Sequence, residues 1–288
     1  QIDHQRFTDD SSQWTYILKE TKTNRVVLNT KSAIFWAHSY DHSFYKYVDN
    51  KEGRQLVLVD AKTMEETVVC KKLPKNQLNI LRNQKQAIIS KPVEGPKADD
   101  NKHLYLHPED RVPGWRDRTA LELFDCETCL STPITYGNRS LRLAGTSLDS
   151  RYAFITVQTE DIEAMRPTTF FTVLRLDLQT MKSDTLIAKD GWIANGTVSP
   201  DGKTLAIKAS SEFADRIGCT LPADQYPSPY DYQLFLLDVE KAINKQSGAI
   251  TPATMKFTPS VEEVNWSVYD NKIYFTALDK DLCRLYRL

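Results

Sequence analysis

The sequence predicts an all-β protein, a β-propeller built from four-stranded antiparallel blades. About five blades are visible, and the last is incomplete. Three observations support this fold class. A short alternating strand that ends in Asp recurs along the chain, a second strand that follows a Ser-containing turn alternates with it, and the pair repeats at intervals of roughly 50–65 residues. A small sheet that repeats in this way is typical of a propeller, in which each sheet forms one blade.

The first repeated element is an apolar alternating run that ends in Asp and continues into a polar turn. Its copies read QLVLVDAKTM, ALELFDCETC and VLRLDLQTM, with a looser copy QLFLLDVEKA. Alternation with a period of two predicts strands rather than helices. An Asp carboxylate at such a position can accept backbone N–H bonds from the turn that follows it. We therefore expect a structural role, and no catalytic role, for Asp60, Asp125, Asp177 and Asp238.

The second element is a Ser, a tight turn and another alternating strand. It reads TSLDSRYAFITV from Thr146, VSPDGKTLAIKA from Val198 and WSVYDNKIYFTA from Trp266. The Asp201-Gly202 pair is a strong hairpin-turn signal. A β-sandwich with similar hairpins is the alternative, but a sandwich gives no reason for the same turn chemistry to recur at the same phase.

The phase of the repeat also sets the expected domain boundaries. By analogy with the earlier copies, the next Asp would fall at about position 289, so the last blade lacks its outer strand. Propellers close on themselves to protect strand edges. We therefore expect a fragment of a larger propeller, unless N-terminal strands complete the last blade. The expected parts are an irregular N-terminal segment with first-blade elements at 1–50, blades at 43–76, 77–138, 139–190 and 191–258, and a partial blade at 259–288.

Composition excludes several classes of partner. The chain is 41% hydrophobic and 26% charged with a formal net charge of -1, so no basic surface indicates nucleic acid. No apolar run is long enough for a membrane span. The N-terminal QIDHQRFTDD has no apolar signal core, so a signal peptide either has been removed or was never present. The sequence does not decide the location, and of the two alternatives we favour a periplasmic or secreted protein whose signal peptide has been removed. The sequence leaves homo-oligomerisation open.

Catalytic and cofactor motifs are absent from the sequence. It contains no Gly-x-Ser-x-Gly nucleophile elbow and no phosphate-binding glycine pattern, so we expect no catalytic residues and no cofactor. The pairs His38/His42 and His103/His107 fall in extended segments, which would hold the two rings about 13 Å apart. We therefore expect no metal site.

Cys126 and Cys129 form a Cys-x-x-C sequence without the second pair that a zinc site needs. In the repeat register they align with apolar residues of other blades, such as Leu178 and Met181. This alignment favours small packed hydrophobic side chains. A disulfide or redox pair is the alternative.

Three connections are longer than the repeat requires: 91–118, 159–168 and 211–231. Long loops on a rigid scaffold commonly carry binding groups. The 211–231 connection, with Tyr226 and Tyr230, is the one we expect to be functional.

Several segments carry a family resemblance. VSPDGKTLAIKASSEF, YDYQLFLLDVEKA and VEEVNWSVYDNKIYFTALDKDLCRLYRL resemble the propeller of prolyl-oligopeptidase-type serine peptidases, in particular bacterial dipeptidyl-peptidase and acylaminoacyl-peptidase-like members. The resemblance covers about 139–288. It implies a C-terminal α/β-hydrolase domain, absent from this chain, that carries the Ser-Asp-His triad. The propeller would gate the access of short peptide substrates to that partner domain, and the chain alone would be inactive.

The same resemblance suggests where substrate would bind. Dipeptidyl peptidases of this family hold the substrate amino group with paired glutamates in a Trp-x-Tyr-Glu-Glu context. Neither Glu65-Glu66 nor Glu262-Glu263 has that context. The expected substrate-binding residues are instead Glu212, Asp215 and Tyr230. The alternative is a non-enzymatic, TolB-like propeller that binds a protein or glycan, because Ser-Pro-Asp-Gly-Lys also occurs in TolB-type propellers.

Overall fold

A computed structural model describes residues 2–6, 14–36, 43–51, 53–74, 76–95, 116–137, 139–161 and 163–288. The pairs His38/His42 and His103/His107 lie outside this described part. Almost all regular elements are strands, and the short helices are α1 (Phe213–Arg216) and α2 (Val239–Ile243). Among the described residues, no helix has the length and apolarity needed to cross a membrane.

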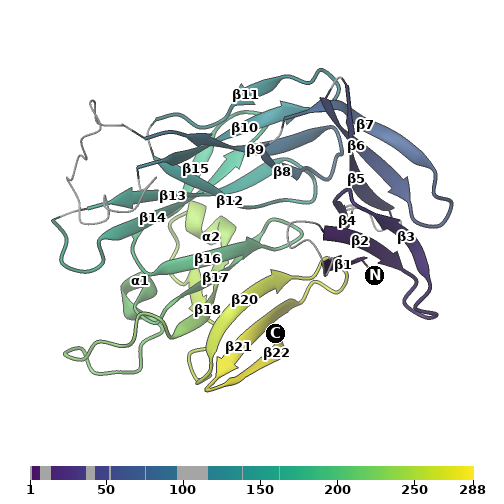
Figure 1. The fold of residues 1–288 in the computed structure, drawn as a ribbon. Coiled ribbons are helices and arrows are strands. Elements are labelled where there is room, and N and C mark those ends of the chain that lie inside the picture. The colour runs from purple at the N-terminus through teal and green to yellow at the C-terminus, as the bar shows by residue number, and fades with distance from the viewer. Residues whose placement is uncertain are drawn as a thin grey trace, which may run out of the picture. The chain divides into compact units, whose positions relative to one another are not determined.

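The chain divides into two compact units, each of which is described by itself. The first comprises residues 1–89 and 122–132, and the second comprises residues 90–121 and 133–288. The described residues form six sheets in all, most of them four-stranded and each made of strands consecutive in sequence (Figure 1). This confirms the predicted all-β propeller class.

The first sheet belongs to the first unit and has three strands. These are β1 (Ile2–Arg6), β2 (Trp14–Lys19) and β3 (Val26–Thr30). They pair antiparallel, with Ile2 opposite Leu18 and Tyr16 opposite Thr30. The sequence predicted only irregular first-blade elements in this region, so the structure adds a sheet to the five blades that were expected.

The turn between β2 and β3 explains why this sheet was missed. Its residues Glu20 to Asn24 form the same turn that Asp60 begins in the next sheet, with Glu in place of Asp. The Asn24 N–H donates to the Glu20 carbonyl at 2.8 Å, and the Met64 N–H donates to the Asp60 carbonyl at 2.8 Å. Asn24 and Met64 both have positive φ, at 56° and 61°. Because Glu20 replaces Asp, this copy does not share the strand-end Asp of the sequence repeat.

The second sheet has four strands and starts at Ile34, earlier than the expected position 43. Its strands are β4 (Ile34–Trp36), β5 (Ser43–Asn50), β6 (Gly53–Asp60) and β7 (Glu66–Leu73). Side chains of this sheet and of β2 share one buried cluster. The cluster contains Leu18, Ile34, Phe44, Val57 and Val59. The first two sheets therefore pack together through a common apolar core.

The third sheet contains the boundary between the two units. Its strands are β8 (Gln77–Ile80), β9 (Gln86–Val93), β10 (Arg118–Asp125) and β11 (Ser131–Pro133). Within the first unit, Ile80, Ala87 and Phe124 pack with Leu56 and Cys70 of the second sheet. Successive sheets of this unit are thus joined by buried apolar faces.

The second unit holds three further sheets, of four, four and three strands. The first is β12 (Ser140–Thr146), β13 (Tyr152–Glu160), β14 (Thr169–Asp177) and β15 (Ser183–Asp190). The next is β16 (Ile193–Val198), β17 (Thr204–Ser210), β18 (Tyr232–Asp238) and β19 (Ile250–Pro252). The last is β20 (Ser260–Trp266), β21 (Ile273–Asp279) and β22 (Leu282–Arg287).

Two buried clusters hold the sheets of the second unit together. Phe154 and Ile187 pack with Phe235 between the β12–β15 and β16–β19 sheets. Ala206 and Leu234 pack with Phe275 between the β16–β19 and β20–β22 sheets. The middle sheet, β16–β19, therefore contributes side chains to both clusters and packs against a neighbour on each side, as a propeller blade does.

The repeated Asp residues lie where the third strand of a sheet meets its turn. Asp60 Oδ1 accepts the Lys62 and Thr63 N–H groups at 2.7 and 2.9 Å. Asp125 Oδ1 accepts the Thr128 N–H at 2.7 Å, and Asp177 Oδ1 accepts the Thr180 N–H at 3.1 Å. Bonds from the Thr128 N–H and hydroxyl hold the pKa of Asp125 below its usual value. Asp238 instead caps α2, where it accepts the Lys241 N–H at 3.0 Å.

Candidate functional site

The long connections of the second unit join the second and third strands of their sheets. Residues 161–168 link β13 to β14, and residues 211–231 link β17 to β18. The third connection includes residues 96–115, which lie outside the described residues. A hydrogen bond joins the two ends of this connection: the Gly95 N–H donates to Asp117 Oδ1 at 2.8 Å. Arg166 is the residue by which the 161–168 connection reaches the 211–231 connection.

Glu212 is buried, with 6% of its side chain exposed, and its carboxylate pairs with Arg166 at 2.8 Å. The Arg166 guanidinium lies against two aromatic rings, with its Cζ 4.9 Å from the centroid of Trp192 and 5.1 Å from that of Tyr226. It also donates to the Pro227 carbonyl at 3.4 Å. The Arg166 side chain therefore balances the charge of a buried carboxylate. It also holds in place the aromatic wall, which consists of the Trp192 and Tyr226 rings.

The backbone after Glu212 follows an unusual path. Ala214, Asp215 and Arg216 all have positive φ, at 50°, 58° and 66°. Such conformations are unfavourable for residues other than glycine. The Phe213 ring anchors the segment, because it is fully buried and contacts Phe235 edge to face at 5.0 Å. Strained backbone held in place by its surroundings is common at binding sites.

Asp190 and Arg216 hold this strained turn from two sides. Asp190 accepts the Ala214 N–H at 3.0 Å and the Trp192 N–H at 2.8 Å. Burial, with a contribution from the nearby Asp215 charge, raises the pKa of Asp190 above its ordinary value. The Arg216 guanidinium donates to the Gln225 carbonyl at 2.9 Å.

These groups surround a cavity of about 490 Å³. Its lining combines aromatic rings with side chains of both charges. The lining residues are Pro167, Phe170, Lys189, Asp190, Gly191, Trp192, Glu212, Asp215, Arg216 and Tyr226. A pocket with apolar walls and a few charged groups can hold a small ligand that has both polar and apolar parts.

Two of the three expected substrate-binding residues line this cavity. Glu212 contributes a carboxylate already occupied by Arg166, whereas Asp215 is exposed. No side chain or N–H group of the described residues donates a hydrogen bond to the Asp215 carboxylate. Tyr230 is not among the lining residues and is 75% exposed, but Tyr226 from the same connection is among them.

Sequence reasoning missed Arg166, Asp190 and Trp192. Arg166 belongs to a different connection, and Asp190 and Trp192 flank the link between two sheets. None of the three lies in a motif. Only the packing of the β12–β15 sheet beside the β16–β19 sheet brings them to Glu212.

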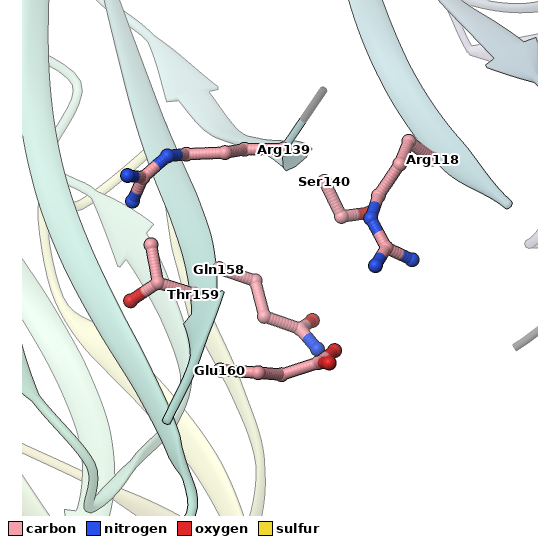
Figure 2. A pocket seen from close by; sticks show the side chains of 6 residues that line it. All are labelled: Arg118, Arg139, Ser140, Gln158, Thr159 and Glu160. Carbon is pink, nitrogen blue, oxygen red and sulfur yellow. The ribbon is translucent and has the colours of Figure 1, made fainter. Parts of the chain in front are cut away.

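A second, polar cavity of about 290 Å³ lies at the ends of β10, β12 and β13. It is lined by Arg118, Arg139, Ser140, Gln158, Thr159 and Glu160. Figure 2 shows Gln158 and Glu160 extending toward the side on which Arg118 lies, whereas Arg139 extends the opposite way. The two guanidinium groups therefore do not converge on one point.

The described residues contain no group of three or more His, Cys, Asp or Glu side chains arranged to hold a metal ion. The lining of the larger cavity supports binding by charge and by aromatic contact.

Comparison with known proteins gives information on the fold alone. No family model matches the sequence, and no curated protein matches it. Among solved structures, uncomplexed acylaminoacyl peptidase from Pyrococcus horikoshii matches with a TM-score of 0.60 and 12% identity over 96% of this chain and 40% of that chain.

Two further solved structures extend the comparison. The β-propeller domain of the trilobed protease from Pyrococcus furiosus matches with a TM-score of 0.58 and 14% identity, over 100% of this chain and 76% of that one. TolB from Acinetobacter baumannii matches with a TM-score of 0.50 and 15% identity, over 96% of this chain and 57% of that one. The chain therefore shares the β-propeller fold of the trilobed protease domain, and its likeness to peptidase structures agrees with the resemblance seen in the sequence.

Proposed function

We propose that this chain is the propeller region of a serine peptidase and that it admits short peptides to an α/β-hydrolase domain outside the chain. The fold shared with peptidase structures supports this proposal. The observation that carries it is the charged and aromatic cavity between the 161–168 and 211–231 connections. Long connections on a rigid scaffold are a common position for substrate contacts.

The cavity offers different contacts to the amino terminus of a peptide and to a side chain next to it. The exposed Asp215 carboxylate can accept hydrogen bonds from a protonated amino terminus. The Phe170 and Trp192 rings offer apolar surface to a neighbouring side chain. Glu212, whose charge is matched by Arg166, keeps the aromatic wall in position. Peptides with a free amino terminus should therefore bind better than their acetylated forms.

Calorimetric titration with the tripeptide Gly-Phe-Gly and its N-acetylated form tests this. We expect the free peptide to bind and acetylation to weaken binding by a factor of about 10–150, since a charge-assisted hydrogen bond contributes roughly 1.5–3 kcal/mol. Asp215→Asn should weaken binding of the free peptide and leave the acetylated peptide unchanged. Asp224→Asn is the matched control, because Asp224 is exposed in the same connection but does not line the cavity.

Activity assays complete the test. The chain alone should bind peptide without hydrolysing peptide p-nitroanilides. Turnover that a serine-directed inhibitor blocks would contradict the assignment of catalysis to another domain. If the Asp215→Asn variant bound the free peptide as tightly as the wild type does, the proposed contact with Asp215 would be wrong.

A non-enzymatic binding propeller is the second candidate, and the similarity to TolB favours it. In that case the ligand would be a protein or a glycan. Binding of neither tripeptide at millimolar concentration would favour this candidate.

A further inference from the structure

Three of the five cysteines meet in the first unit, although Cys70 is distant in sequence from Cys126 and Cys129. Cys70 lies on β7, and Cys126 and Cys129 lie in the turn between β10 and β11. The Cys70 Sγ is 4.0 Å from the Cys129 Sγ. All three are free thiols; Cys70 and Cys126 are buried, and Cys129 is partly exposed. Elsewhere in the repeat the position of Cys129 is taken by Met64 and Met181.

The geometry points to a reversible disulfide between Cys70 and Cys129 that links the β4–β7 sheet to the β8–β11 sheet. A disulfide needs sulfurs about 2.05 Å apart, and small side-chain rotations can bring together two sulfurs that are already in contact. The bond would close a long loop of the chain, and such links stabilise by restricting the unfolded state. This inference does not depend on the proposed function.

The exposure of the three thiols decides the order of reaction. Burial raises the pKa of Cys70 to about 11 and that of Cys126 to about 12, so both stay protonated near neutral pH. The partly exposed Cys129 therefore reacts first with a small-molecule disulfide such as oxidised glutathione.

The exchange balances in two steps. The Cys129 thiolate attacks one glutathione sulfur, which forms a mixed disulfide and releases the other glutathione as a thiolate. Cys70 then loses its proton to solvent and attacks Cys129 Sγ, which expels the second glutathione. Two protein thiols are oxidised, and one glutathione disulfide is reduced to two glutathione molecules.

Peptide mapping of the chain after incubation with oxidised glutathione tests the inference. The exposed Cys283 is replaced by Ala to prevent bonds between chains. Remaining thiols are then alkylated, and the chain is cut with trypsin. We expect the Cys70 peptide Thr63–Lys71 to be joined to Thr119–Arg139, which contains Cys126 and Cys129. Cleavage after Glu127 separates these two cysteines and identifies the partner.

Thermal unfolding provides the second measurement. Oxidation should raise the unfolding midpoint by about 5–10 °C, and dithiothreitol should reverse the change. Cys70→Ala and Cys129→Ala should each abolish the shift, whereas Cys126→Ala should keep it. Full alkylation of Cys70 under oxidising conditions, or a bond between Cys126 and Cys129, would overturn the inference. The peptide map gives that answer even if a variant folds poorly.

Discussion

Glu212 shows how a single contact determines what a charged residue can do. A carboxylate after an inner strand suggests a substrate contact, but in the structure Arg166 occupies it at 2.8 Å. The charge is thereby matched inside the protein, and Asp215 is the cavity carboxylate that remains exposed. Through this pair, Glu212 also holds the Arg166 guanidinium against the rings of Trp192 and Tyr226.

We predict that Arg166→Ala lowers the free energy of unfolding by about 1.5–3 kcal/mol. The change leaves a buried carboxylate without its charge partner, and desolvated charges are costly to leave unpaired. The expected loss lies below that for a fully buried pair, because 37% of the Arg166 side chain is exposed. Urea denaturation measures the effect.

Lys189→Ala is the matched control for this variant. It also removes an ion pair, to Asp161 at 3.4 Å, but the two side chains are 60% and 38% exposed. Exposed pairs contribute little, so the change should stay within about 0.5 kcal/mol. Equal losses in the two variants would show that burial of Glu212 does not decide the cost.

Among the elements of the fold, the turn that begins at the acidic residue after a strand (Glu20, Asp60, Asp125 or Asp177) is the most regular. Its fifth residue has positive φ in each of four sheets: Asn24 at 56°, Met64 at 61°, Cys129 at 58° and Met181 at 56°. Only Asn24 is a residue type that tolerates this conformation well. The other three are held there by the Asx-type hydrogen bonds of the turn.

This regularity predicts that Met181→Asn stabilises the protein by about 0.5–1 kcal/mol, because Asn adopts the left-handed conformation at lower cost. Met181 is 47% exposed, so little packing is lost. Met64→Asn is the comparison, because Met64 packs against a buried cluster and should gain nothing. The difference between the two urea midpoints measures the effect. A fall in the Met181→Asn midpoint would contradict this account of the turn.

Turn chemistry also marks how far the elements could be predicted from sequence. The copies with Asp60, Asp125 and Asp177 were recognisable because the side chain that forms the turn is the same in each. The Glu20 copy was not recognised, since a longer acid replaces Asp. The second repeated element, a tight turn followed by a strand, has an unrecognised copy at 81–86 with Asn in place of Asp. Asn83 Oδ1 accepts the Lys85 N–H at 3.0 Å, as Asp201 Oδ1 accepts the Lys203 N–H at 3.1 Å.

At the scale of the whole molecule, neighbouring sheets of the second unit approach each other closely at their first strands. Gly145 of β12 has φ of 158°, and a Cβ atom there would lie 2.6 Å from Val198 Cγ1 of β16. That distance is far below ordinary contact. The absence of a side chain at Gly145 therefore lets neighbouring sheets meet.

We predict that Gly145→Ala lowers the free energy of unfolding by about 2–3 kcal/mol, because the new methyl group overpacks the contact between sheets. Gly196→Ala in β16 is the matched control. Its Cβ would meet the Ala206 carbonyl oxygen at 3.5 Å, an ordinary contact, so a change of no more than about 0.5 kcal/mol is expected. A small effect at Gly145 in denaturant titration would mean that the sheets separate easily.

The sequence determined the strand-and-turn unit and its repetition, because alternation and turn side chains act between residues close along the chain. The tertiary structure decided which side chains meet across neighbouring sheets. It paired Glu212 with Arg166, left Asp215 exposed in the cavity and brought Cys70 to Cys129. Repetition specifies each sheet separately, but contacts between sheets depend on distances that no local pattern records.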